Sequence, residues 1–212
     1  MNFSRVSSSV AAAACALSLA GALAACGSDT DTASDTASGG TPSVTGVASS
    51  VVPEAPPAAS ACPPAAPEAG GTPEWTLPGA TGSVSVIGPT DTTAPEIVVE
   101  APFSVDETQV HTLQAGDGPV VADTATVSVC YMGVNGRDGS VFDSSYQRGA
   151  PVDFPLDGVV PGFQKAIAGQ TVGSTVAVAM TSADGYPNGQ PAAGIAPGDT
   201  LVFAIEILHA AN

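Results

Sequence analysis

The sequence predicts an α+β fold, in which one short helix is inserted late into an antiparallel β-sheet. Three features of the 212 residues support this prediction. Apolar and polar residues alternate over several short stretches of the C-terminal half, which is typical of half-buried strands. The spacing changes to a helical period only at 160–167. Five of the six phenylalanines lie beyond residue 100, so the material for a hydrophobic core is concentrated there.

The clearest expected strand is 125–132. Its residues Val127, Val129 and Tyr131 fall on one face and alternate with more polar neighbours. Further strands of the same domain are expected at 106–113, 141–145, 152–156, 174–180 and 200–209.

The expected helix follows the strand at 152–156. Val160, Phe163 and Ile167 are spaced i, i+3 and i+7, which places them on one helical face. Pro161 suits the first turn and Gly169 suits the end of a helix. A helix at this point separates the early strands from the last two.

Composition and charge exclude some classes of function. The formal net charge is −16 and only four residues are Lys or Arg, so no basic surface for nucleic acid is expected. The four cysteines, Cys15, Cys26, Cys62 and Cys130, form no Cys-x-x-Cys or Cys/His cluster. We therefore expect neither a metal site nor a cofactor.

The first 25 residues predict a signal peptide. An apolar, Ala-rich run ends in Leu23-Ala24-Ala25-Cys26, which resembles the bacterial lipobox, in which a lipid is attached to the Cys. A lipid on Cys26 would anchor the protein at the extracytoplasmic side of a bacterial cell membrane. The alternative is an ordinary signal peptide cut after an Ala.

Three segments are expected after the signal peptide. Residues 26–72 are rich in Pro, Ala, Ser and Thr and predict a disordered tether. Residues 73–100 predict an accessory segment with two short strands, at 74–77 and 83–87, whose packing the sequence does not specify. Residues 101–212 predict the folded domain. Pairing of Cys62 with Cys130 is left open, because it would require the tether to be held against that domain.

Several motifs in the domain resemble the FKBP-type peptidyl-prolyl cis-trans isomerases over about residues 107–210. In order, they are Tyr131-Met132-Gly133, Val141-Phe142-Asp143-Ser144-Ser145, Val159-Val160-Pro161-Gly162-Phe163, Gly185-Tyr186-Pro187, Gly194-Ile195-Ala196-Pro197 and Thr200-Leu201-Val202-Phe203. The resemblance implies a twisted antiparallel sheet of about five strands wrapped around the helix, with an apolar pocket between them.

The resemblance also implies roles for individual residues. Catalytic roles fall to Tyr131, Phe142, Asp143, Tyr186 and Phe203. Substrate-binding roles fall to Arg148, Phe154, Val159, Val160, Phe163 and Ile195. Asp143 would lie at the pocket rim, oriented by Tyr131 and Arg148. The Val160 N–H would hold a substrate carbonyl, and the Tyr186 hydroxyl would donate from a long loop. Phe163 would form the pocket floor, where the family commonly has Trp, and Val152 stands where an aromatic residue is common.

The implied activity is rotation about X–Pro bonds in extracytoplasmic proteins, assisting their folding. The partners would be proline-containing polypeptides and, through Cys26, the membrane; nucleic acid is excluded and a monomer is expected. Two alternatives remain: a non-catalytic peptide-binding or chaperone module on the same fold, and a structural β-domain of the cell envelope.

Overall fold

The computed structural model describes residues 61–67 and 70–211, which belong to one compact unit. The predicted signal peptide, the lipidation site at Cys26 and most of the predicted tether lie outside the described residues.

The main element of the fold is a six-stranded antiparallel sheet in the order β4-β8-β9-β5-β6, with β7 also paired to β5. Its strands are β4 (Gln109–Gln114), β5 (Thr126–Asn135), β6 (Val141–Ser144), β7 (Val152–Pro155), β8 (Thr175–Met180) and β9 (Leu201–Ala211). The central strand β5 pairs along its whole length with β9, while β7 and β6 pair with successive halves of its other edge. The predicted antiparallel sheet is confirmed.

One face of this sheet holds the predicted helix. Helix α2 (Pro161–Ile167) lies against it, with Pro161 in the first turn as expected. The buried face of α2 packs onto residues that alternate along the strands, such as Val127 and Val129. A 3₁₀ turn, η1 (Leu156–Gly158), connects β7 to α2, and a second, η2 (Pro191–Ala193), lies in the long loop before β9.

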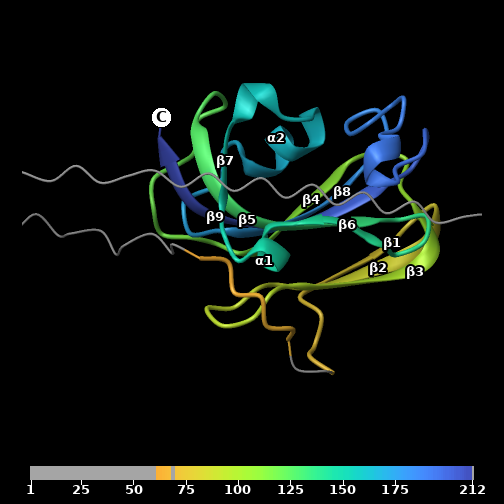
Figure 1. The fold of residues 1–212 in the computed structure, drawn as a ribbon, viewed down its shortest axis with the longest axis horizontal. Coiled ribbons are helices and arrows are strands. Elements are labelled where there is room, and N and C mark those ends of the chain that lie inside the picture. Colours follow the sequence, from red (N-terminus) through yellow and green to blue (C-terminus); the bar gives the residue numbers. More distant parts are fainter. Residues whose placement is uncertain (1–60, 68–69, 212) are drawn as a thin grey trace, which may run out of the picture. The chain divides into compact units, whose positions relative to one another are not determined.

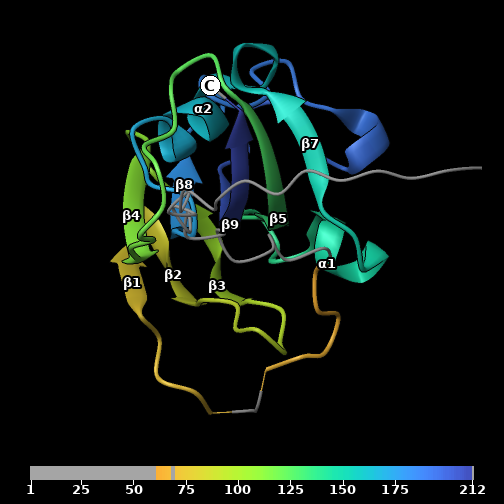
Figure 2. The ribbon, with the colours of Figure 1, turned by 90° about the vertical axis from the view of Figure 1, so that its left-hand side faces the viewer.

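The opposite face of the six-stranded sheet is covered by a second antiparallel sheet. It has the order β1-β2-β3, from β1 (Trp75–Pro78), β2 (Thr81–Ile87) and β3 (Glu96–Ser104). Figures 1 and 2 show these strands on the side of the larger sheet away from α2. Their apolar residues Val84, Val86 and Phe103 pack on residues of β8 and β9. The segment predicted as accessory is therefore one layer of a sandwich.

This second layer explains why β8 is buried at every position. Val176, Val178 and Met180 face α2, whereas Ala177 and Ala179 face the second sheet. The small alanines allow the two sheets to approach closely. Because β3 spans residues 96–104, the division predicted at residue 100 falls inside a strand.

Two further features adjoin the sheet. A one-turn helix, α1 (Ser145–Arg148), follows β6 directly and was not predicted. The pairing of Cys62 with Cys130, which the sequence leaves open, is present as a disulfide. The last part of the predicted tether thus contains a point of covalent attachment to β5.

None of the helices in the described ranges is both long enough and apolar enough to cross a membrane.

Candidate functional site

A cavity of about 370 Å³ opens between α2 and the six-stranded sheet. Its walls come from β5, β6, β7, β9, the η1–α2 junction and the loop after β8. It is lined by Tyr131, Phe142, Asp143, Phe154, Gly158, Val159, Val160, Phe163, Tyr186 and Phe203.

Aromatic rings form most of the surface of the cavity. Phe163, on α2, is at the centre of the set: its ring centroid lies 5.4 Å from those of Phe154 and Phe203 and 5.9 Å from that of Tyr131, each in a near-perpendicular arrangement. Phe142 meets Phe203 in the same way, at 5.4 Å. Edge-to-face contacts of this kind are favourable beyond the area they bury. The rings therefore hold one another in a fixed, apolar enclosure.

Gly133 makes room for two of these rings. A Cβ built on Gly133 would lie 2.7 Å from both the Phe142 and Phe203 rings, closer than real Cβ contacts occur. Gly133 lies on β5, opposite Asp143 of β6 and Phe203 of β9. The missing side chain thus lets the rings from both neighbouring strands meet across β5.

A polar cluster lies at the rim, around Asp143. The Tyr131 hydroxyl donates to one carboxylate oxygen, and Arg148 Nη1 donates to the other at 2.5 Å. Arg148 Nη2 also donates to the Tyr131 hydroxyl at 3.1 Å, which closes a triangle of three side chains. Arg148 lies on α1, Asp143 on β6 and Tyr131 on β5, so three consecutive elements define the carboxylate position.

The electrostatics of this triangle keep Asp143 ionised and Tyr131 neutral. Burial alone would raise the pKa of Asp143, but the hydrogen bonds from Tyr131 and Arg148 and the Arg148 charge outweigh it and lower the pKa. Burial, together with the hydrogen bond to Asp143, raises the pKa of Tyr131 to about 12. The hydrogen bond to Asp143 likewise raises the pKa of Arg148.

Two hydrogen-bond donors at the cavity have no partner within the described part of the chain. One is the backbone N–H of Val160, which precedes α2; its carbonyl accepts from Phe163 and Gln164. The other is the Tyr186 hydroxyl. The backbone of Tyr186 is held in place by Ser182 Oγ, which donates to the Tyr186 carbonyl at 3.2 Å. Both donors are available to carbonyl groups of a bound peptide.

The structure brings together nine of the eleven residues predicted for catalysis or substrate binding. Arg148 does not line the cavity and contacts it through Asp143 and Tyr131. Ile195 is buried in the core next to the cavity rather than in its lining. Gly158 lines the cavity and was not predicted; Gly133 was quoted in a motif but given no role. A glycine carries no side-chain signal of its own, so its role depends on what packs against it.

The cavity has features that suit the binding of a peptide. Among residues 61–67 and 70–211, no group of three or more His, Cys, Asp or Glu side chains is placed to hold a metal ion. The cavity lining includes no Ser, Cys, Lys or His side chain. It combines an apolar enclosure, one fixed carboxylate and two free donors.

Comparison with known proteins gives consistent matches. A family model described as "FKBP-type peptidyl-prolyl cis-trans isomerase" matches residues 118–208. The FKBP-type 22 kDa peptidyl-prolyl cis-trans isomerase of Escherichia coli is 39% identical over 101 residues, which are 48% of this chain and 48% of that protein. The chain thus spans about half the length of this relative.

Two shorter relatives are covered over most of their length. A protein named FK506-binding protein from Streptomyces anulatus is 36% identical, over 44% of this chain and 77% of its own. A probable FK506-binding protein from Corynebacterium glutamicum is 30% identical, over 55% of this chain and 98% of its own.

Proposed function

The chain belongs to the FKBP-type peptidyl-prolyl cis-trans isomerase family, and we propose that its folded domain catalyses rotation about X–Pro bonds in proline-containing polypeptides. The observation that carries the proposal is the position of two free donors and a fixed carboxylate around one ring-walled cavity.

The chemistry of the reaction fits these groups. Rotation must cross a barrier of about 18–20 kcal/mol that arises from amide resonance. The planar amide is more charge-separated than the twisted one, so an apolar environment favours the twisted form relative to water. The rings of Phe142, Phe163 and Phe203 supply that environment and match a flat proline ring. No covalent bond is broken, so the site needs no nucleophile.

The polar groups would hold the peptide while one bond turns. The Val160 N–H would bind a carbonyl on one side of the proline and the Tyr186 hydroxyl would bind another, so that only the X–Pro bond is free to rotate. Asp143, kept ionised by Tyr131 and Arg148, would shape the field around the turning carbonyl without exchanging a proton. This division of work uses the three polar side chains that line the cavity, Tyr131, Asp143 and Tyr186, and one backbone N–H.

Isomerisation of a proline-containing peptide, measured with and without tacrolimus, tests the proposal. We expect a rate above the uncatalysed one and full inhibition once tacrolimus fills the cavity. Binding of tacrolimus without any rate enhancement would instead support a non-catalytic peptide-binding module. Neither binding nor rate enhancement would support a structural domain.

We further propose that the protein is a lipoprotein with its lipid on Cys26 and acts as a monomer on the extracytoplasmic side of a bacterial membrane. The order of residues before Cys26 supports the lipid anchor. Mass spectrometry of the chain expressed in a bacterium should find acyl groups on Cys26. The Cys26→Ala variant should no longer be found in the membrane fraction. An unmodified Cys26 would contradict the proposal.

A further inference from the structure

A disulfide lies directly behind the rim of the cavity. It joins Cys62 to Cys130 across 68 residues of sequence, and both cysteines are 0% exposed. Cys130 immediately precedes Tyr131 on β5. The segment that carries Cys62 is held at a second point, where the Ala94 N–H donates to the Ala65 carbonyl at 2.7 Å. Residues N-terminal to both sheets are thus fixed next to a residue of the site.

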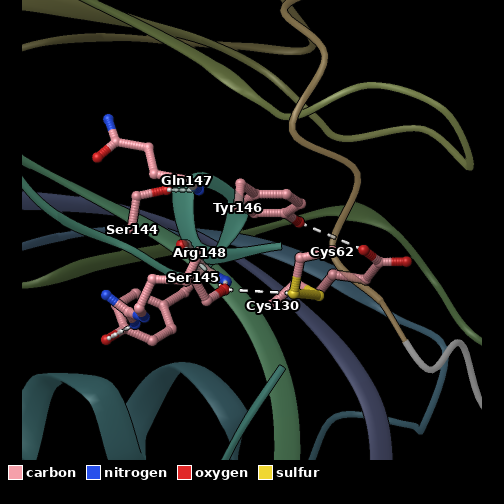
Figure 3. Close-up of a disulfide and its surroundings, with 9 residues drawn as sticks. Cys62, Cys130, Ser144, Ser145, Tyr146, Gln147 and Arg148 are labelled. Atoms are coloured by element: carbon pink, nitrogen blue, oxygen red, sulfur yellow. Dashed lines mark hydrogen bonds between the residues drawn. A yellow bond between two sulfur atoms is a disulfide. The ribbon is translucent and has the colours of Figure 1, made fainter. Parts of the chain in front are cut away.

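One hydroxyl contacts both the disulfide and the site. Ser145 Oγ lies 3.4 Å from Cys62 Sγ and accepts a hydrogen bond from the Tyr131 N–H at 2.8 Å. A dashed line in Figure 3 marks the contact between Ser145 and Cys62. A disulfide sulfur has no hydrogen, so the Ser145 hydroxyl is the donor in this contact, and its one hydrogen is shared with the Tyr131 carbonyl, which lies 3.4 Å from the same oxygen. Ser145 therefore joins the disulfide to the backbone that carries the Tyr131 hydroxyl.

Helix α1 packs against the disulfide. Tyr146 is buried in a cluster with Cys62, Cys130 and Ala94, and its hydroxyl donates to Glu206 at 3.3 Å. Only two residues further on, Arg148 ends the helix and donates a hydrogen bond to Asp143. A helix of a single turn gains too little from its own hydrogen bonds to be stable alone, so its position depends on this packing.

The geometry points to a positioning role for the Cys62–Cys130 disulfide: it fixes α1 and β5 so that Arg148 and Tyr131 hold the Asp143 carboxylate at the rim. The inference deepens the proposed function, because it matters for turnover only if Asp143 acts on the substrate. It also gives the 61–67 segment a role that the family match, which begins at residue 118, does not include.

Amide hydrogen exchange tests the placement itself. In the full chain, the variant Cys62→Ala/Cys130→Ala is compared with Val84→Ala, a cavity mutation between the two sheets and away from α1. Exchange is measured under conditions where both variants are fully folded. We expect the amides of Tyr131 and Gly149 to exchange at least about tenfold faster, relative to those of β8, in the cysteine variant only. Unchanged relative exchange at both amides would overturn the inference.

A double-mutant cycle then tests whether the disulfide acts through Arg148. Removing the disulfide should lower kcat/KM by about three- to fivefold in the unmodified background but less than about twofold in the Arg148→Met background. The Val84→Ala mutation should change kcat/KM by the same factor in the unmodified and the Arg148→Met backgrounds. If the factors by which the cysteine and Arg148 substitutions lower kcat/KM simply multiply in the combined variant, the disulfide is merely structural. That result would overturn the inference.

These two arms separate this inference from the proposed function. If the unmodified chain shows no turnover, the cycle is run on the affinity for tacrolimus. If that is also absent, the proposed function fails, while hydrogen exchange still decides whether the disulfide positions Tyr131 and α1.

Discussion

Arg148 Nη1 lies 2.5 Å from Asp143 Oδ1, although the two side chains remain 47% and 41% exposed. An exposed ion pair is worth about 0.2–1 kcal/mol in most proteins, so this one contributes little to folding. Its effect is geometric, because the same guanidinium also reaches the Tyr131 hydroxyl. The pair fixes the direction of a carboxylate at the entrance of an apolar cavity.

Replacing Arg148 with Met should therefore reduce activity more than stability. Loss of one orienting partner should lower kcat/KM by about two- to fivefold, with a change in the free energy of unfolding below about 1 kcal/mol. The control is Lys165→Met, which removes the ion pair with Asp184 and leaves the rim intact. An equal loss of activity in both variants would point to net charge rather than to orientation of Asp143.

The pH dependence of turnover at acidic pH should follow the titration of Asp143. Its pKa in the folded protein is lowered from the ordinary 3.8 because the hydrogen bonds from Tyr131 and Arg148 exceed the effect of burial. The ionised carboxylate thus stabilises the folded site above the ordinary pKa, and this contribution is lost as the pH falls through the lower folded value. Turnover should stay level from neutral pH downward and decline only below 3.8.

The Arg148→Met variant should show this decline at a higher pH than the unmodified chain. The pH profile of kcat/KM for a peptide without titrating groups measures both. A decline centred well above the ordinary carboxyl pKa in the unmodified chain would contradict an Asp143 that is held ionised.

The pKa of Tyr131 offers a separate test, because Asp143 and Arg148 shift it in opposite directions. Burial and the hydrogen bond to Asp143 raise it to about 12, whereas Arg148 lowers it. The neutral hydroxyl therefore favours the folded site below its unfolded pKa of about 10, and this contribution is lost as the pH rises through about 12. Asp143→Asn should lower the pKa of Tyr131, and Arg148→Met should raise it.

Tyrosinate absorbance during alkaline titration measures these shifts, and Tyr131→Phe identifies the transition that belongs to Tyr131. Shifts of the same sign in the two variants would show that the triangle of Tyr131, Asp143 and Arg148 does not govern this hydroxyl.

Gly133→Ala should damage the cavity directly. The new Cβ would come within 2.7 Å of the Phe142 and Phe203 rings, so at least one ring must move. Overpacking of this kind costs about 1–3 kcal/mol. We expect that loss in the free energy of unfolding together with at least about tenfold weaker tacrolimus binding. The control is Gly158→Ala, also at the cavity, where the new Cβ meets only Pro155 at 3.4 Å.

The second sheet should contribute to stability but not to the site. Val84→Ala removes buried volume between the sheets and should lower the free energy of unfolding by about 2 kcal/mol with unchanged kcat/KM.

A chain that begins at residue 106 lacks β1–β3 and should be far less stable, because one face of β8 and β9 becomes exposed. Denaturant unfolding measures the stability of both variants. A truncated chain as stable as the full one would refute the two-layer account.

The residues of the cavity were more predictable than the layers around it. Helix α2 buries one face, and β5 places its larger apolar residues Val127, Val129 and Tyr131 on the side of α2, so both segments show a clear period in the sequence. Strand β3 was missed because Ile97, Val98 and Val99 break any alternation and Pro102 interrupts the pattern. The four residues of α1 are too few to show a helical period. The Cys62–Cys130 pairing depends on tertiary placement, which no spacing of cysteines specifies.

If the proposed function is right, the cavity itself accelerates X–Pro rotation. The most direct test is the equilibrium cis–trans exchange rate of a proline peptide, measured by NMR with the full chain and with the Phe142→Ala/Asp143→Ala variant. We expect exchange well above the uncatalysed rate with the full chain, and a return to nearly the uncatalysed rate with a variant that is still folded. Exchange at the uncatalysed rate with the unmodified chain, or equal acceleration by both proteins, would contradict the proposed function.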